Sequence, residues 1–197
     1  AKFHFKLSFN RDNKYIDCTG KSFLDFLHGN LDIMPGEKPT IEDWENHLST
    51  IFTEVRLKKF IEVRGADAGN WRRTCALPAF WVGILYGENS INAAESICDA
   101  WTVEDIEKLS IEVAKFGLDA EIQGTKVLNI AQNLLEIAKS SLITRDIRDA
   151  VGNNESIYLH VLEEILQKKV SPAKDLLKSF EFEYKNSMVK LLEGIAY

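Results

Sequence analysis

Cysteine is scarce in this sequence of 197 residues, which contains three cysteines. Cys18, Cys75 and Cys98 are widely spaced, odd in number and without a CxxC pair, so the sequence predicts neither a disulfide framework nor a zinc knuckle. Free thiols fit a reducing compartment best. We therefore expect the protein to be cytoplasmic.

Long apolar runs and an excess of positive charge are also missing. The longest apolar stretches, such as residues 76–86, are far shorter than the ~20 residues of a membrane-spanning helix, so we expect a soluble protein without a membrane partner. Lysine and arginine total 24 against 30 acidic residues, and the net charge is −6. This acidic balance disfavours broad binding to nucleic acid, so any site for an anionic ligand must be local.

Strand patterns dominate the first third of the chain. Residues 3–9 alternate between apolar and polar side chains, and residues 14–18 predict a second, short strand. The residues between them, Arg11-Asp12-Asn13, favour a tight turn. The pair therefore predicts a β-hairpin.

Helical patterns occur in two places within the first third and dominate the remainder of the chain. We expect a short helix over 22–27 and a helix that Thr40 caps, with Asp43 completing the capping box and His47 in a packing position. Further helices are expected over 75–81 (buried), 90–101, 102–116, 125–144, 156–168 and from 171 to near the end. The sequence thus predicts an α+β fold in one domain over 1–197, with strands and a loop in 1–86 and a helical region in 87–197.

The segment 53–64 combines an apolar face with an ionic face. Alternation separates one set (Val55, Leu57, Ile61, Val63) from another (Glu54, Arg56, Lys58, Phe60, Glu62, Arg64). Such a pattern usually indicates an antiparallel strand whose outer face lies in water. A ligand site on the ionic face is the alternative interpretation.

Two features favour the ligand site. Residues 53–73 hold six basic and three acidic residues, a local positive surplus in an acidic chain. The segment also runs into a loop of small residues, 65–70, which allows the backbone to approach a ligand closely. Glu62 can ligate Mg²⁺, and Arg64, two residues further on the same face, can hold phosphoryl oxygens.

The sequence around this loop resembles the plant and proteobacterial type of glutamate-cysteine ligase, in its C-terminal portion. The resemblance rests on residues 53–67 (TEVRLKKFIEVRGAD), Trp71-Arg72-Arg73 and residues 75–83 (CALPAFWVG). Residues 14–20 (KYIDCTG) and 43–48 (DWENHL) extend it, and it thins beyond Trp101.

This resemblance implies a glutamine-synthetase-like carboxylate-amine ligase fold, in which helices back a curved antiparallel sheet. It also implies a reaction: the γ-carboxylate of L-glutamate is joined to the amine of L-cysteine through a γ-glutamyl phosphate, using ATP and Mg²⁺. That reaction is the first step of glutathione biosynthesis. By position, Glu62 is implied as a Mg²⁺ ligand and Arg64 as the catalytic arginine that neutralises the transferring phosphoryl group.

Other residues of the segment have less defined roles. Arg56 shares the ionic face and is a candidate contact for nucleotide phosphate or substrate. For Arg72 and Arg73, binding of ATP or a substrate carboxylate and simple anchoring of the loop are both open. We expect Asp67 to stabilise the loop and Cys75 to be a buried, inert thiol.

The length of the chain limits what it does alone. Enzymes of the resembled family carry most of their metal ligands and substrate-binding arginines in an N-terminal half that has no counterpart here. We therefore expect an N-terminal half, supplied by the same or another chain, and no activity without it. The alternatives are a structural or assembly partner of a separately encoded half, and a related carboxylate-amine ligase with another amine acceptor.

Overall fold

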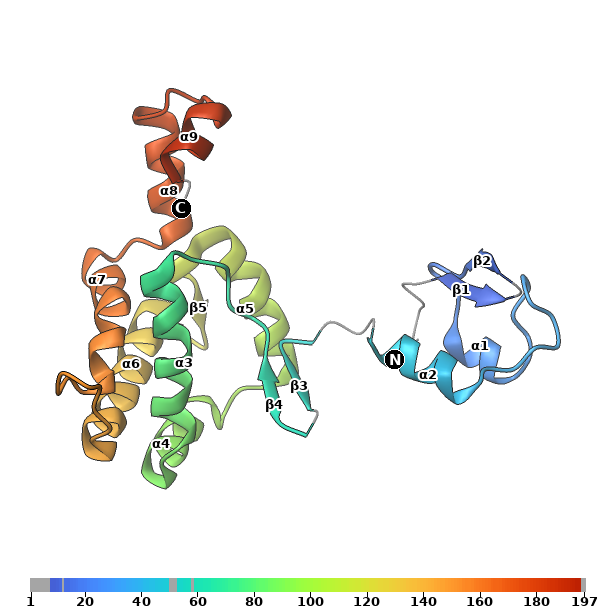
Figure 1. The fold of residues 1–197 in the computed structure, drawn as a ribbon, viewed down its shortest axis with the longest axis horizontal. Coiled ribbons are helices and arrows are strands. Elements are labelled where there is room, and N and C mark those ends of the chain that lie inside the picture. Colours follow the sequence, from blue (N-terminus) through green and yellow to red (C-terminus); the bar gives the residue numbers. More distant parts are fainter. Residues whose placement is uncertain (1–7, 12, 50–52, 58, 196–197) are drawn as a thin grey trace. The chain divides into compact units, whose positions relative to one another are not determined.

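A computed structural model describes residues 8–11, 13–49, 53–57 and 59–195, and the chain divides into two compact units, residues 1–66 and 67–197 (Figure 1). Short strands prevail in the first unit and helices in the second, which confirms the α+β class. The single domain over 1–197 stays a prediction.

The first unit begins with a β-hairpin. Strands β1 (Ser8–Arg11) and β2 (Lys14–Asp17) are antiparallel, and Arg11 lies opposite Lys14. Asn13 between them has φ 62°, a left-handed conformation that asparagine tolerates. The predicted hairpin is confirmed over these residues, whereas residues 1–7 and Asp12 lie outside the described part of the chain.

A small core lies between this hairpin and two helices, α1 (Phe23–Leu27) and α2 (Ile41–Ser49). Its buried side chains are Cys18, Phe23, Phe26, Leu31 and Met34. The buried ring of His47 stacks on Phe23 with 4.3 Å between ring centroids, and burial lowers the pKa of this histidine. His47 therefore occupies the expected packing position.

Asp43 links the start of α2 to the hairpin. Its buried carboxylate accepts two hydrogen bonds from the Arg11 guanidinium, at 2.6 and 3.0 Å, and one from the Thr40 backbone N–H at 2.8 Å. Thr40 Oγ1 in turn accepts from the Asp43 N–H, which confirms the predicted capping box. Burial opposes the charge of Asp43, but the bonds from Arg11 and Thr40 outweigh this effect, so its pKa lies below the usual value.

We expect Asp43→Asn to destabilise the first unit at neutral pH by about 1 kcal/mol, since charge-assisted hydrogen bonds are lost. Because the folded-state pKa is depressed, the stabilisation is fully present above the pKa of an unfolded aspartate, ~3.9. It is lost as the pH falls through the folded value. Urea unfolding followed by NMR signals of α2 amides should show a gap between wild type and variant that closes in acid.

Asp32→Asn is the matched control in the same unit. Asp32 also accepts a hydrogen bond from a base, Lys21, but this pair is exposed, and exposed pairs contribute little. A gap for Asp43→Asn that is independent of pH, or no larger than that of Asp32→Asn, would show that the buried pair does not stabilise the unit.

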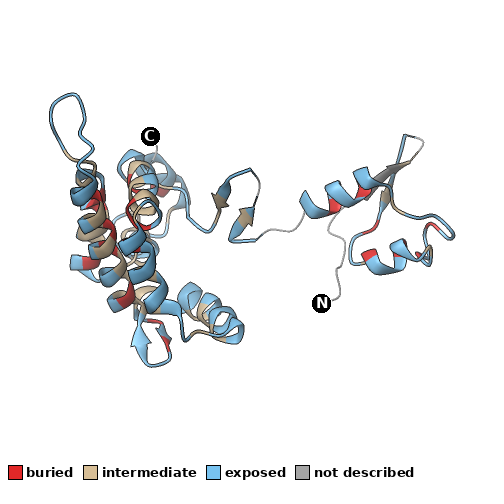
Figure 2. Cartoon of the chain, turned by 90° about the horizontal axis from the view of Figure 1, so that it is seen from below, coloured by how far each residue is buried: buried red, intermediate tan, exposed pale blue. Residues whose placement is uncertain are grey.

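The segment 53–64 is a hairpin and not the continuous strand that its alternation predicts. Strands β3 (Val55–Leu57) and β4 (Ile61–Val63) are antiparallel, with Arg56 opposite Glu62. Residues 59 and 60 lie in the bend, and Lys58 is outside the described residues. No described residue of 53–66 is buried (Figure 2), and Leu57 on the apolar face is 83% exposed. The period of two persists through the bend because paired strands project their side chains to the same two faces.

The second unit is mainly helical. Its elements are α3 (Trp71–Leu85), α4 (Glu88–Cys98), α5 (Val103–Phe116), the 3-10 helix η1 (Gly117–Asp119), β5 (Glu121–Ile122), β6 (Thr125–Lys126), α6 (Val127–Arg145), the 3-10 helix η2 (Glu155–Leu159), α7 (His160–Lys168), α8 (Pro172–Phe182) and α9 (Met188–Ile195). The main core is formed by Ile84, Leu135, Ala138, Leu142, Leu159 and Leu166. Figure 2 shows this burial along the facing sides of the helices.

Several helix bounds differ from prediction. Helix α3 is longer than the predicted 75–81, α4 lies over 88–98 and not 90–101, and the helix predicted over 156–168 is η2 followed by α7. Helix α6 begins at Val127 because Thr125 and Lys126 form β6, which pairs with β5. The helix predicted from 171 onward is two helices, α8 and α9. Lys185 and Asn186 between them are left-handed, and the Asn186 N–H donates to Phe180 O, a bond that ends α8. Within the described ranges, no helix has both the length and the apolarity needed to cross a membrane.

Candidate functional site

The β3–β4 hairpin carries the predicted site residues of the first unit on one face. Arg56 Nε donates to Glu62 Oε2 at 2.7 Å across the hairpin, and both side chains are about 30% exposed. Just beyond this pair, the Arg64 N–H donates to the Glu54 carbonyl at 2.7 Å. Each acidic residue of the face therefore lies opposite an arginine.

The charged side chains of this face are paired. The prediction that Arg56 and Glu62 share a face is confirmed, but the sequence did not predict that they form an ion pair. Charges alternate on the hairpin itself, so the positive surplus of residues 53–73 comes from the bend and from Arg72 and Arg73. A balanced face is compatible with a wet surface and with a site that offers both a carboxylate and guanidinium groups.

The glycines flanking the loop accommodate side chains of the protein itself. A Cβ atom on Gly65 would collide with the Glu54 carboxylate, and one on Gly69 would lie 2.7 Å from the Arg73 Cβ. The expectation that these small residues let the backbone approach a ligand stays a prediction, and the structure adds a local reason for the two glycines. They let the chain pass close to Glu54 and Arg73.

Arg72 and Arg73 lie in the first turn of α3, and not before the helix as predicted. Asn70 caps this turn by accepting a hydrogen bond from the Arg73 N–H at 3.1 Å. Arg72 donates two hydrogen bonds to Glu164 of α7, at 2.6 and 3.1 Å. The hydrogen bond from Arg72 lowers the pKa of Glu164. Arg72 thus anchors α3 to α7, and its role in binding stays a prediction, as does that of Arg73.

The five predicted site residues are divided between the units. Arg56, Glu62 and Arg64 belong to the first unit, and Arg72 and Arg73 belong to the second. Asp67 is exposed at the start of the second unit, and its predicted role in the loop stays a prediction.

The described residues do not form a complete metal site by themselves. Among them, no three His, Cys, Asp or Glu side chains lie close enough to hold a metal ion together. Mg²⁺ is often bound through one or two protein carboxylates together with substrate phosphates. Glu62 fits the role of one such ligand, and any further protein ligands would have to come from elsewhere.

Helix α3 is buried less completely than expected. Its buried residues are Ala76, Gly83 and Ile84, while Trp71 is 78% exposed. Cys75 is half-buried, which corrects the prediction of a buried thiol. The apolar residues of 75–81 cover more of the helix surface than one neighbouring face can bury.

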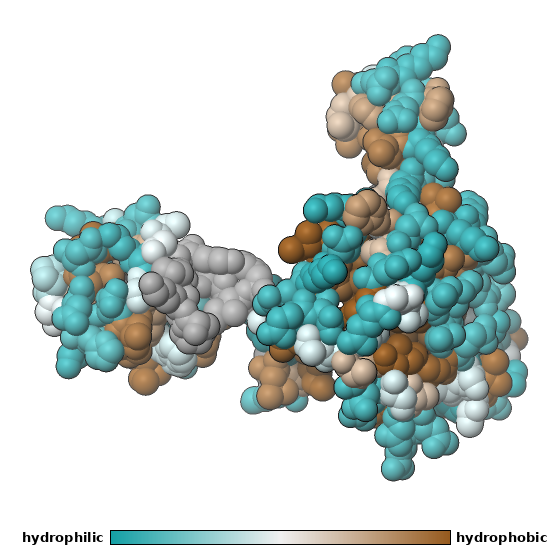
Figure 3. Space-filling model, turned by 180° about the vertical axis from the view of Figure 1, so that it is seen from behind, coloured by the Kyte–Doolittle hydropathy of each residue, from teal (hydrophilic) through white to brown (hydrophobic). Residues whose placement is uncertain are grey.

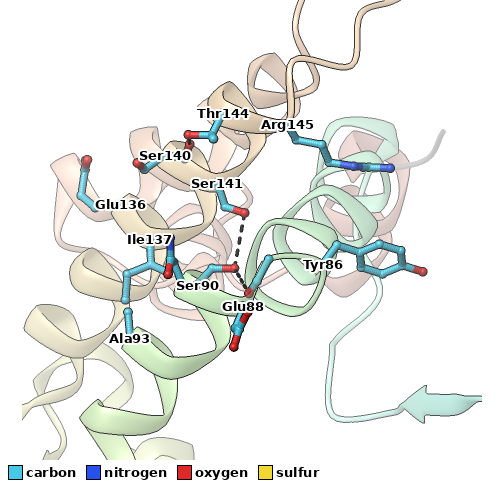
Figure 4. Close-up of a pocket in the computed structure, with 12 residues that line it drawn as sticks. Tyr86, Glu88, Ser90, Ala93, Glu136, Ile137, Ser140, Ser141, Thr144 and Arg145 are labelled. Carbon is cyan, nitrogen blue, oxygen red and sulfur yellow. Dashed lines mark hydrogen bonds between the residues drawn. The ribbon is translucent and has the colours of Figure 1, made fainter.

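Sequence reasoning did not predict a cleft of about 730 Å³ between α4 and α6. Figure 4 shows hydroxyl groups along its walls, from Ser90, Ser140, Ser141 and Thr144. At one end, Arg145 lies 5.5 Å from the Tyr86 ring centroid and forms an ion pair with Glu155 at 2.9 Å. The spacing of Ser140, Ser141 and Thr144 along α6 is a signal for this cleft that the sequence contains.

Three of these hydroxyl groups, those of Ser90, Ser141 and Thr144, already donate hydrogen bonds within the protein. Ser90 Oγ donates to the carbonyls of Ile84 and Gly87, and Ser141 Oγ donates to Ser90 Oγ. Thr144 Oγ1 donates to Ser140 O. These bonds tie the turn between α3 and α4 to α6, so the cleft wall has a structural explanation.

Comparison with known proteins identifies the relationship. The family model "Glutamate-cysteine ligase family 2 (GCS2)" matches residues 8–190. Proteins named "Glutamate–cysteine ligase, chloroplastic" are similar over 187 residues, or 95% of this chain. The identity is 43% for Solanum lycopersicum, 44% for Medicago truncatula and 43% for Arabidopsis thaliana. The chain spans 35–36% of the length of these relatives.

These names overturn one prediction. The scarcity of cysteine predicted a cytoplasmic protein, but the curated relatives are named as chloroplastic. The prediction was wrong because unpaired thiols indicate a reducing environment, and a reducing environment does not distinguish one compartment from another.

Proposed function

The chain belongs to glutamate-cysteine ligase family 2, and on this premise we propose that it forms part of an ATP-dependent ligase of glutathione biosynthesis. The reaction would join the γ-carboxylate of L-glutamate to the amine of L-cysteine. ATP would first phosphorylate that carboxylate, and the amine would displace phosphate from the γ-glutamyl phosphate. The fold of the whole protein would be glutamine-synthetase-like, with the hairpins of this chain extending its sheet.

The β3–β4 hairpin is the observation that carries the proposal. It holds one carboxylate, Glu62, against one guanidinium, Arg56, at 2.7 Å, and Arg64 follows two residues after Glu62. Transfer of a phosphoryl group to a carboxylate brings anions together, and catalysis therefore depends on positioned cations. The hairpin offers both kinds of group on one face.

Each residue of the hairpin has a distinct proposed role. Arg56 holds the Glu62 carboxylate in position and contacts nucleotide phosphate. Glu62 would supply an oxygen ligand to Mg²⁺, and the bound ion would supply positive charge that offsets the phosphate charge. Arg64 would act as the catalytic arginine that neutralises the transferring phosphoryl group. Arg72 and Arg73 are proposed as secondary contacts to ATP or a substrate carboxylate.

Two further observations support an active site that this chain shares with another polypeptide segment. The described residues contain no group of three metal-ligating side chains, and the chain spans about a third of the length of its relatives. An N-terminal portion, in the same or another chain, would supply the remaining ligands and the pocket for the amine. The identity of the amine acceptor thus depends on residues outside this segment.

The test is release of phosphate from ATP by the chain combined with the N-terminal portion of the ligase. We expect release only when both L-glutamate and L-cysteine are present, because the phosphorylated intermediate needs both substrates for turnover. Coupled phosphate detection and mass spectrometry of γ-glutamylcysteine measure this directly. Turnover with another amine in place of cysteine would favour a related carboxylate-amine ligase, and no dependence on glutamate would refute the proposal.

A further inference from the structure

The hairpin of helices α8 and α9 exposes an extended apolar surface. We define the α8–α9 apolar surface by its exposed large side chains: Leu176, Leu177, Phe182, Met188, Val189, Leu192 and Ile195. Phe182 is 78% exposed and Val189 is 66% exposed. Figure 3 shows apolar side chains among polar ones on this part of the helical unit. Large exposed apolar patches on a protein usually mark an interaction site.

The hairpin is ordered, because its inner side is packed. Leu191 is buried, and the Tyr184 ring lies so close to Gly194 that a Cβ atom there would clash with it. Ser187 caps α9 by accepting from the Lys190 N–H. On α9, Met188, Leu192 and Ile195 recur at the spacing of one helical face. The exposed side chains therefore belong to a formed surface.

The base of the hairpin is fixed to the helical unit. Lys174 in the first turn of α8 forms an ion pair with Asp119 of η1 at 2.7 Å. Ser171, which caps α8, lies against Gly117. Beyond this first turn, α8 and α9 pack mainly against each other and project from the other helices of the unit (Figure 1). The apolar surface is thus presented on a fixed support.

Charge and length indicate what covers this surface. Residues 172–195 hold four lysines and four acidic residues. Their net charge is therefore zero, and electrostatic attraction does not determine which partner binds this surface. The relatives are almost three times as long as the matched segment, and that additional polypeptide is available to bury apolar side chains. Burial of apolar area without charge steering is typical of permanent contacts within one protein assembly.

We propose that the α8–α9 apolar surface is the docking surface for the N-terminal portion of the ligase. The inference rests on the proposed function, in which this portion completes the active site. The N-terminal portion would present a complementary apolar face, whether it belongs to the same chain or to another. Binding should change little between ~0.1 and ~0.5 M salt, because screening affects charged contacts and not apolar ones.

The test uses the 197-residue chain and the remaining polypeptide of the Solanum lycopersicum relative, expressed together as separate chains. Leu192→Lys places a charge in the middle of α9 without touching the buried Leu191. We expect affinity, measured by biolayer interferometry on the purified pair, to fall about a hundredfold. Circular dichroism should show that the variant keeps its helices, since Leu192 is exposed.

Ile111→Lys is the matched control. Ile111 lies in the middle of α5 and is as exposed as Leu192, at 58% against 57%, so the two substitutions are comparable. Because Ile111 lies outside the α8–α9 apolar surface, its replacement should leave affinity unchanged. Failure of the wild-type pair to co-purify, or equal effects of the two variants, would overturn the proposal. Dimers of the chain alone that Leu192→Lys dissociates would also overturn it in favour of a second copy.

Activity separates this inference from the proposed function. If the wild-type pair assembles through α8 and α9 but releases no phosphate with glutamate and cysteine, the docking surface stands and the proposed function fails. If Leu192→Lys leaves affinity unchanged while phosphate release depends on both substrates, the proposed function stands and the docking surface fails.

Discussion

Replacing Glu62 by glutamine should lower turnover of the assembled ligase by about a hundredfold or more. Glutamine keeps the size of the side chain. Its amide oxygen can still accept the hydrogen bond that Arg56 Nε donates to Glu62 Oε2 at 2.7 Å. It removes the negative charge that a Mg²⁺ ligand needs. Loss of metal-ion stabilisation of the transferring phosphoryl group costs several kcal/mol in the transition state. The measurement is kcat for phosphate release with L-glutamate and L-cysteine at saturating ATP, together with the Mg²⁺ concentration at half-saturation, which should rise.

Glu121→Gln is the matched control for this experiment. Like Glu62, Glu121 is an acidic residue opposite a base in a two-stranded hairpin, since it pairs with Lys126 across β5 and β6. Its replacement should leave kcat and the Mg²⁺ dependence unchanged. If Glu62→Gln behaves like Glu121→Gln, the ionic face of the β3–β4 hairpin is a wet surface, which is what alternation alone most often means.

Local signals in the sequence predicted local structure well. Thr40 and Asp43 form the predicted capping box, and Thr102 forms another with Asp105 at the start of α5. These motifs are read correctly because a cap depends on side chains three residues apart and on little else. The pairing of residues 8–11 with 14–17 follows from a short turn for the same reason.

Interactions between distant residues could not be predicted from the sequence. The bend at residues 59 and 60 conserves the period of two, so one strand and a hairpin look alike in the alternation. The bonds from Arg72 to Glu164 join residues 92 positions apart, and no local pattern specifies such a partner. The contact of Gly83 with α6 is also a long-range interaction. The sequence around a glycine inside a helix does not indicate which other helix packs against it.

Gly83 lies where α3 packs closely on α6. A Cβ atom on Gly83 would lie 2.5 Å from the Ala138 carbonyl oxygen and 2.8 Å from its Cα. These are backbone atoms of a helix, so they do not move aside as the end of a flexible side chain does. A methyl group at this position must therefore push the two helices apart, and the neighbouring core of Ile84, Leu142 and Leu159 opens with them.

Gly83→Ala should lower the free energy of unfolding of the helical unit by about 2 kcal/mol. Overpacking of a tight core costs up to about 3 kcal/mol, and the better helix propensity of alanine offsets about 1 kcal/mol. Urea unfolding followed by far-UV circular dichroism measures the change. Ala114→Ser, which also adds one heavy atom but at an exposed position of α5, should shift stability by less than about 0.5 kcal/mol. A stabilising effect of Gly83→Ala would show that α3 and α6 do not approach this closely, because helix propensity would then be the larger effect.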